Sequence, residues 1–319
     1  MFQTKALYNL LRINAKEDPS LKVEPWMLED LRSVSSEELL ARLKKADLPL
    51  DKALLLQFAQ ECDSPEELAD LLLSEELAPE EQDRLYLLLF ELWRRLLPER
   101  PSLSIFCDEL DEWISQFDTD RLESDEPLQD ALANFIDILE EHVDAGMTPH
   151  EAYKRISEYA AHDLELFLYD YISSLIDAGN QTYAMELFES LAPALSRSLR
   201  FRLLGARLSA EPEESDRLFK EVIEDSHSDS ELLFETLRCL TSVGEGDLFS
   251  RALRKLFPKM KTEEELQEVM ELSAEYYRRL DQDTLEQAIL EIKEKRSPQG
   301  EMLRLSDPDV HRLKELLCQ

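Results

Sequence analysis

Apolar residues recur at intervals of three and four along most of the chain, which is the spacing of amphipathic α-helices. Leu233, Leu237 and Leu240 follow this spacing, and no stretch alternates convincingly between apolar and polar residues as a strand would. Helix starts are clearly marked. Thr148 is followed by a proline and then by Glu151, the arrangement of a capping box. The pattern predicts an all-α fold.

The helical pattern repeats with a period of 33 residues. The tripeptide Asp-Ala-Gly ends at Gly146 and again at Gly179, and an apolar helical stretch precedes both copies. Pro212 and Gly244 continue the series of turn residues, so that successive turns are 33, 33 and 32 residues apart. A less regular fifth unit covers residues 263–295. A fixed period of this size is typical of stacked helical hairpins, in which each hairpin buries its apolar face on its neighbours.

The clearest unit has apolar residues in its first helix, then a glycine, a small residue and an aromatic residue. These are Leu168, Ile172, Leu175, Gly179, Ala184 and Phe188. The unit resembles the tetratricopeptide repeat, and the resemblance extends in degenerate form over roughly residues 130–295. It implies an α-solenoid, with the glycine shaping the turn and Phe188 buried between its own hairpin and the next. The alternative is an irregular antiparallel bundle with hairpins of similar length.

Polar stretches divide the chain into three parts. Residues 117–127 contain no apolar stripe, and residues 295–302 form a second polar stretch before a last predicted helix, which follows Asp307. We predict an N-terminal helical bundle, a helical-hairpin repeat domain, and a linker with a capping helix, covering residues 1–125, 126–295 and 296–319.

The charge of the chain excludes two classes of partner. The formal net charge is -34, from 70 acidic and 36 basic residues. Residues 101–150 contain fourteen acidic residues and one basic residue, Arg121. Binding to nucleic acid requires clustered lysine and arginine, so we expect no nucleic acid partner. An anionic membrane surface would repel the chain for the same reason.

Other features of the sequence favour a cytoplasmic protein. The four cysteines are widely separated, without a Cys-x-x-Cys pair, as is common for reduced thiols. The first twenty residues lack the uninterrupted apolar core of a signal peptide. The most apolar run, residues 85–97, is too short and too charged to span a bilayer. We expect it to form a helix buried among other helices.

No group of residues in the sequence indicates catalysis. The five histidines are scattered, and the single Glu-x-x-His, Glu224 with His227, has no second copy, so that no metal site is expected. A Gly-x-Ser-x-Gly motif is absent, and six glycines are too few for a phosphate-binding loop. Acidic neighbours of Cys62 and Cys107 should raise the pKa of both thiols. We expect no enzymatic activity and no cofactor.

Three classes of function remain. The first is a protein-binding scaffold or chaperone-like adaptor that holds a peptide or helix of a partner protein, because stacked hairpins form a groove. The second is an acidic nucleic-acid mimic that binds a basic protein through residues 101–150. The third is an all-helical enzyme with no recognisable motif. We favour the scaffold.

The resemblance also implies which residues would bind the partner. In tetratricopeptide stacks the first helix of each hairpin lines the concave face, at positions four residues apart. Counting back from each turn gives the candidate residues Ile136, Tyr169, Ser173, Arg202, Phe234 and Arg238. The two arginines would suit a segment with acidic and apolar side chains, because guanidinium groups bind carboxylates and stack on aromatic rings. Alternatively, both arginines pair with nearby acidic residues of the chain itself.

Overall fold

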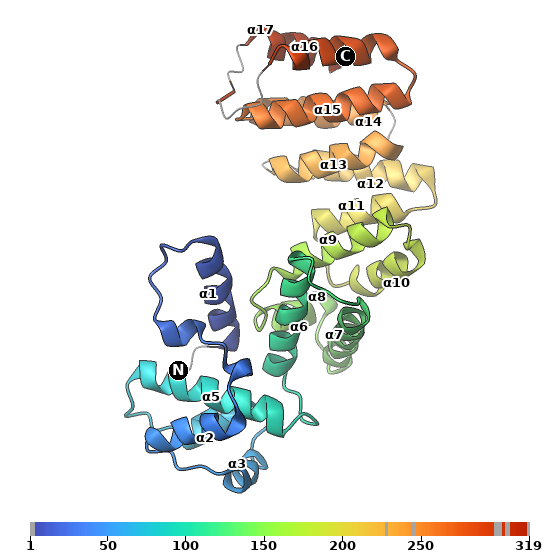
Figure 1. Ribbon diagram of the computed structural model, residues 1–319. Helices are drawn as coiled ribbons and strands as arrows, with labels where there is room; N and C mark the ends of the chain where they lie inside the picture. Colours follow the sequence, from blue (N-terminus) through green and yellow to red (C-terminus); the bar gives the residue numbers. More distant parts are fainter. Residues whose placement is uncertain (1–3, 227–228, 244–245, 297–301, 304–306, 318–319) are drawn as a thin grey trace. The chain divides into compact units, whose positions relative to one another are not determined.

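The predicted helical class is confirmed. The computed structural model describes residues 4–226, 229–243, 246–296, 302–303 and 307–317. In these residues it contains seventeen α-helices and three short 3-10 helices, without any strand (Figure 1). An isolated bridge between Thr262 and Met302 is the one extended pairing in that part of the chain.

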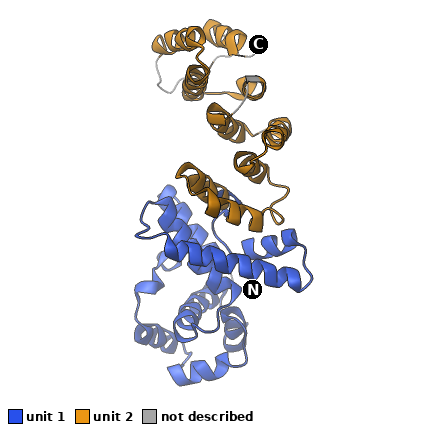
Figure 2. Cartoon of the chain, turned by 90° about the vertical axis from the view of Figure 1, so that its right-hand side faces the viewer, with its two compact units in different colours: residues 1–167 blue, residues 168–319 orange. Residues whose placement is uncertain are grey.

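The chain forms two compact units, unit 1 with residues 1–167 and unit 2 with residues 168–319 (Figure 2). This division lies about forty residues beyond the boundary that the polar stretch 117–127 suggested. The difference arises because residues 126–162 pack on the helices before them. Cys107 Sγ lies 3.6 Å from the carbonyl oxygen of Ile156, and Asp111 accepts hydrogen bonds from the backbone of Ala161 and His162. The three-part domain organisation stays a prediction.

Unit 1 is built around one long buried helix. Its elements are α1 (Lys5–Glu17), η1 (Pro25–Leu28), η2 (Leu31–Ser33), α2 (Ser36–Lys45), α3 (Lys52–Ala59), α4 (Pro65–Leu72), α5 (Pro79–Leu96), α6 (Leu103–Asp118), α7 (Glu126–Asp144) and α8 (Pro149–Ser157). Helix α5 packs against α2, α4 and η2, and buries Tyr86, Phe90 and Trp93 completely. The apolar run at residues 85–97 is therefore a buried helix, as predicted. Helix α1 packs on α6 and η1.

Unit 2 is a succession of helices, many of which pack on the next helix along the chain. They are α9 (Leu164–Asp177), which begins just before the unit, then α10 (Gln181–Leu191), α11 (Leu199–Leu208), α12 (Pro212–Asp225), α13 (Ser230–Val243), α14 (Gly246–Leu256), η3 (Phe257–Lys259), α15 (Glu263–Arg279), α16 (Asp283–Glu294) and α17 (Pro308–Leu317). Helix α13 packs on both α11 and α15, whereas α14 packs on α12 and α17. The predicted last helix after Asp307 is confirmed as α17.

The two Asp-Ala-Gly copies form the same turn. Gly146 and Gly179 have φ angles of 105° and 80°, in the left-handed region that glycine adopts without strain. The N–H of the residue after each glycine donates to the carbonyl five residues earlier, at 3.1 and 2.8 Å. This is the Schellman ending of a helix. Asp281 ends α15 in the same way, with φ 54°, whereas Gly244 lies outside the described residues.

Phe188 joins one hairpin to the next, but it is half-buried and not fully buried as the repeat pattern suggested. Its ring stacks on Phe201 of α11, with ring centroids 6.2 Å apart. A Cβ atom built on Gly205 would lie 3.1 Å from Phe188 Cζ. Gly205 thus lets the ring approach the backbone of α11, which corrects the expectation of complete burial while keeping the contact between hairpins.

Alanine at Gly179 and at Gly205 is expected to have opposite effects. Gly179→Ala places a Cβ in the left-handed region and should cost about 1–2 kcal/mol, although nothing lies within 4 Å of that Cβ. Gly205→Ala should stabilise unit 2 by about 0.5 kcal/mol, since alanine favours the helix and the half-buried Phe188 ring can tilt outward. Urea unfolding followed by circular dichroism measures both changes. Equal effects of the two substitutions would contradict the backbone argument.

Candidate functional site

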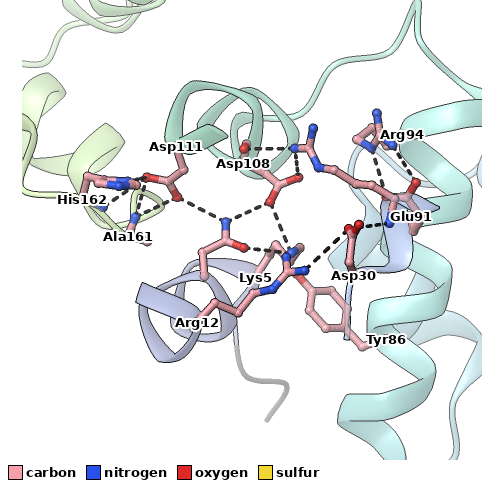
Figure 3. A network of polar contacts seen from close by, with 12 residues as sticks. Lys5, Arg12, Asp30, Tyr86, Glu91, Arg94, Asp108, Asp111, Ala161 and His162 are labelled. Carbon is pink, nitrogen blue, oxygen red and sulfur yellow. Dashed lines mark hydrogen bonds and ion pairs between the residues drawn. The ribbon is translucent and has the colours of Figure 1, made fainter. Parts of the chain in front are cut away.

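A cleft in unit 1, which we call the α1–α6 cleft, is lined by many charged side chains. It has a volume of about 900 Å³ and is lined by α1, residues 28–32, Arg94 of α5, α6 and His162. Its charged and histidine residues are Arg12, Lys16, Asp30, Arg32, Arg94, Asp108, Glu109, Asp111, Glu112 and His162. Figure 3 shows that several of these side chains point toward one another. The cleft therefore brings together residues from five separate segments.

Helix α1 contributes the basic and amide side chains on one of its faces. Lys5, Asn9, Arg12 and Lys16 are spaced four, three and four residues apart, which places them along one side of a helix. Lys5 and Asn9 contact α6, whereas Arg12 and Lys16, further along, line the cleft. Tyr8, three residues after Lys5 and four before Arg12, lies beside this face and packs against Trp26, with ring centroids 5.9 Å apart.

Asp108 of α6 is the centre of the first charge cluster, and 4% of the residue is exposed. Its carboxylate lies 3.3 Å from Lys5 Nζ and accepts from Arg32 Nη2 at 2.7 Å and from Asn9 Nδ2 at 2.9 Å. Burial raises the pKa of Asp108, but the charges of Lys5 and Arg32 and these hydrogen bonds together outweigh it. The net result is a pKa below the ordinary value, so the group is ionised.

Asp111, one turn further along α6, binds the segment after α8. Its carboxylate accepts the backbone N–H of Ala161, at 2.9 and 3.0 Å, and that of His162 at 3.1 Å. The same carboxylate lies 2.9 Å from His162 Nδ1 and 3.3 Å from Asn9 Nδ2. These bonds place the imidazole at the wall of the cleft, with Nδ1 directed at the carboxylate.

Buried Glu91 of α5 binds two arginines, of which Arg94 lines the cleft. It binds Arg94 through two hydrogen bonds, of 3.0 and 2.6 Å, and Arg95 through one of 2.5 Å. Arg95 in turn donates to the carbonyl oxygens of Leu31 and Arg32, at 2.9 and 3.0 Å. The chain of contacts from α5 to η2 fixes the backbone from which Arg32 reaches Asp108.

The predicted partner-binding residues lie in different surroundings. Ile136 is half-buried on α7 in unit 1. In unit 2, Tyr169 and Phe234 are core residues, 3% and 6% exposed, which leaves a partner almost no surface on either ring. Half-buried Arg202 binds Asp225 of α12 at 2.9 Å. It thus lies against the second helix of its own hairpin.

Three of the predicted residues do lie close together. Tyr169 Oη is 3.4 Å from Glu235 Oε2, and Arg238 binds Glu235 and also Glu268 of α15. Ser173 lies one helical turn after Tyr169 and is half-buried. Both predicted arginines therefore pair with acidic residues of the chain, which was the alternative reading of the sequence. Their role in binding a partner stays a prediction.

The pKa values of the two thiols are raised, as the sequence predicted. Burial, and then the charges of Glu67 and Glu61, raise the pKa of Cys62. Burial is also the main reason for the raised pKa of Cys107, followed by Asp111 and Asp108. Within the described ranges, no three His, Cys, Asp or Glu side chains are grouped so that they could bind a metal ion.

Comparisons with protein-family models, with curated proteins and with solved structures found no match to this chain. The resemblance to the tetratricopeptide repeat therefore stays an interpretation of the sequence. None of the helices in the described part of the chain combines the length and apolarity that crossing a membrane requires.

The sequence reasoning missed the α1–α6 cleft entirely. One signal could have indicated part of it, namely the spacing of Lys5, Asn9, Arg12 and Lys16 on a single helix face. Nothing in the sequence marks Asp108 and Asp111 among 70 acidic residues as the two that this face meets.

Proposed function

We propose that this protein is a non-enzymatic, cytoplasmic scaffold. Its tetratricopeptide-like stack of hairpins, an α-solenoid, holds a helix or extended peptide of a partner protein along α9, α11, α13 and α15. The partner segment carries basic and apolar side chains. This differs from the acidic segment that the predicted groove arginines suggested, and the reason lies in how those arginines are paired.

The observation that supports a basic partner is a row of ion pairs, which we call the first-helix row. Its members come from α9, α11, α13 and α15, and they are Asp177, Arg207, Glu235, Arg238 and Glu268. Arg207 binds Asp177 at 2.5 Å, and Arg238 binds both glutamates. A partner carboxylate would have to displace these acids, whereas Asp177, with a side chain 70% exposed, offers oxygens to an incoming cation.

The charge of the whole chain supports the same partner. Three acids and two arginines leave the row with a negative balance, and the chain carries a net charge of -34. A strongly acidic surface accelerates encounter with a basic segment and disfavours acidic ones. The alternative reading, in which residues 101–150 mimic nucleic acid, shares the basic partner but places the contact in unit 1.

Selection from a random peptide library on the full chain tests the proposal, and we expect it to enrich peptides with lysine or arginine among apolar residues. In fluorescence anisotropy, the double change Asp177→Lys and Glu268→Lys should raise the Kd of such a peptide at least about tenfold. The matched control is Glu189→Lys with Glu213→Lys, because these exposed glutamates lie on α10 and α12 and the change in net charge is the same.

Each other outcome counts against a defined part of the proposal. If both double variants weaken peptide binding equally, net charge alone explains the attraction. The first-helix row is then not the binding site. Enrichment of acidic peptides would restore the arginines as the binding groups. The nucleic-acid mimic would be supported by a peptide that binds the first-helix variant as tightly as the unaltered chain. The same peptide would have to lose its binding when the charges of Asp137 and Glu141 are reversed.

A further inference from the structure

The buried acids of the α1–α6 cleft already bind donors of the chain itself, and the side chains of Asp108 and Asp111 are only 3% and 4% exposed. Asp108 receives donors from Lys5, Asn9 and Arg32, and Asp111 receives them from Asn9, two backbone N–H groups and His162. Burial and these bonds together shield both carboxylates from a cationic ligand.

The arginines of the cleft, by contrast, retain donors. Arg12 meets Asp30 only at 3.6 Å, beyond hydrogen-bond distance. Arg32 uses Nη2 and Arg94 uses Nε and Nη2, so that Nη1 of each has no acceptor within the described residues. Their side chains are 27%, 28% and 20% exposed, which keeps them partly shielded from water yet reachable.

The acids that still have accessible oxygens lie at the rim. Glu109 and Glu112 are exposed, and the side chain of Asp30 is 56% exposed. Water screens charges at such positions far more than it screens half-buried guanidinium groups. The interior of the cleft therefore favours a negative group, even though the molecule as a whole is acidic.

The dimensions of the cleft suit a small molecule. Its volume of about 900 Å³ lies within the range of ligand-binding pockets. Half-buried Trp113 adds an apolar aromatic surface to the lining. Guanidinium groups bind carboxylate and phosphate in a planar, bidentate manner, which lysine cannot do.

We propose that the α1–α6 cleft is a binding site for a small organic anion, whose carboxylate or phosphate group is bound by Arg12, Arg32 and Arg94. Lys16 lies at the opening and adds a further positive charge, and the body of the anion packs on Trp113. This site uses no residue of the first-helix row, and it stands whether or not unit 2 binds a peptide.

Isothermal titration calorimetry of the full chain tests the site with inorganic phosphate, citrate and adenosine monophosphate, and with adenosine as the neutral comparison. We expect saturable binding of at least one anion at millimolar or lower concentration, and none of adenosine. Phosphate and adenosine monophosphate binding without citrate binding would identify a phosphate site, whereas the reverse would identify a carboxylate site.

Two substitutions with opposite expected effects on the Kd test whether the anion binds in this cleft. Arg12→Gln should raise the Kd at least about tenfold, and it should leave folding intact because Arg12 makes one long ion pair. Asp30→Asn removes that competing carboxylate and should lower the Kd. Lys52→Gln, an exposed position on α3 with the same change in charge as Arg12→Gln, is the control and should bind as the unaltered chain does.

The proposal is overturned if none of the three anions gives a saturable heat. It is also overturned if Arg12→Gln and Lys52→Gln bind the anion equally well, because binding would then lie elsewhere or depend on net charge alone. Failure of the peptide selection on unit 2 would leave these results unchanged, so the two proposals can fail separately.

Discussion

Replacing Asp108 with alanine is expected to lower the free energy of unfolding of unit 1 by about 3–5 kcal/mol. The Asp108 side chain is 3% exposed and pairs with Lys5 and Arg32. Without it, the ammonium group of Lys5 stays within the protein but loses its counter-charge, and burial already lowers the pKa of Lys5. Urea unfolding followed by circular dichroism measures the loss.

The neighbouring residue on the same helix provides the control. Glu109 is exposed, so Glu109→Ala should change the stability by no more than about 0.5 kcal/mol. Similar losses from both alanine variants would show that the charge cluster around Asp108 adds little to stability.

The effect of Asp108→Ala should depend on pH in a defined direction. The folded-state pKa of Asp108 lies below its ordinary value of about 4. Its contribution is therefore complete above that ordinary value and is lost as the pH falls toward the folded-state pKa. The difference in stability between the unaltered chain and the variant should be largest near neutral pH and should shrink in acid. A constant difference would mean that lost packing, and not charge, explains the effect.

Phe249→Ala is expected to cost unit 2 about 3–5 kcal/mol. The Phe249 ring is fully buried and stacks on Tyr276, with ring centroids 3.9 Å apart and an interplanar angle of 1°. Removing the ring loses its transfer free energy and leaves a cavity between α14 and α15. Thermal and urea unfolding of the full chain measure the change.

Phe188→Ala is the matched comparison, because it removes the same ring from the same unit. Phe188 is half-buried, so we expect a loss of about 1–2 kcal/mol. Equal costs at both positions would show that Phe188 packs more tightly than its exposure indicates. A cost below about 0.5 kcal/mol at Phe249 would contradict the stacked core.

The helices, their starts and several of their ends could be predicted from the sequence. Thr148 with Glu151 and Thr262 with Glu265 form complete capping boxes, as their spacing indicated. Gly179 ends α9 in the left-handed conformation. These features depend on groups within about five residues of one another, and for that reason the local sequence contains all the information they need.

The partners of the charged residues were decided by the tertiary structure alone. Asn9 binds Asp108 across 99 positions of the chain, and Arg32 binds it across 76. Because the chain has 70 acidic residues, the sequence offers every basic residue many possible partners with the same chemistry. Which pairs form depends on where the packing of α1, α5 and α6 places them, and on which acids that packing removes from water.

The same reasoning applies to the predicted groove residues, whose role in binding stays a prediction. The helical period correctly placed Tyr169 and Phe234 on helices, but it could not distinguish a concave surface from the core. Burial is a property of all the helices packed around a residue. The sequence by itself determined an acidic, all-α chain with defined helix ends, and the tertiary structure decided which charges meet in the α1–α6 cleft, because only packing brings distant segments within hydrogen-bond distance.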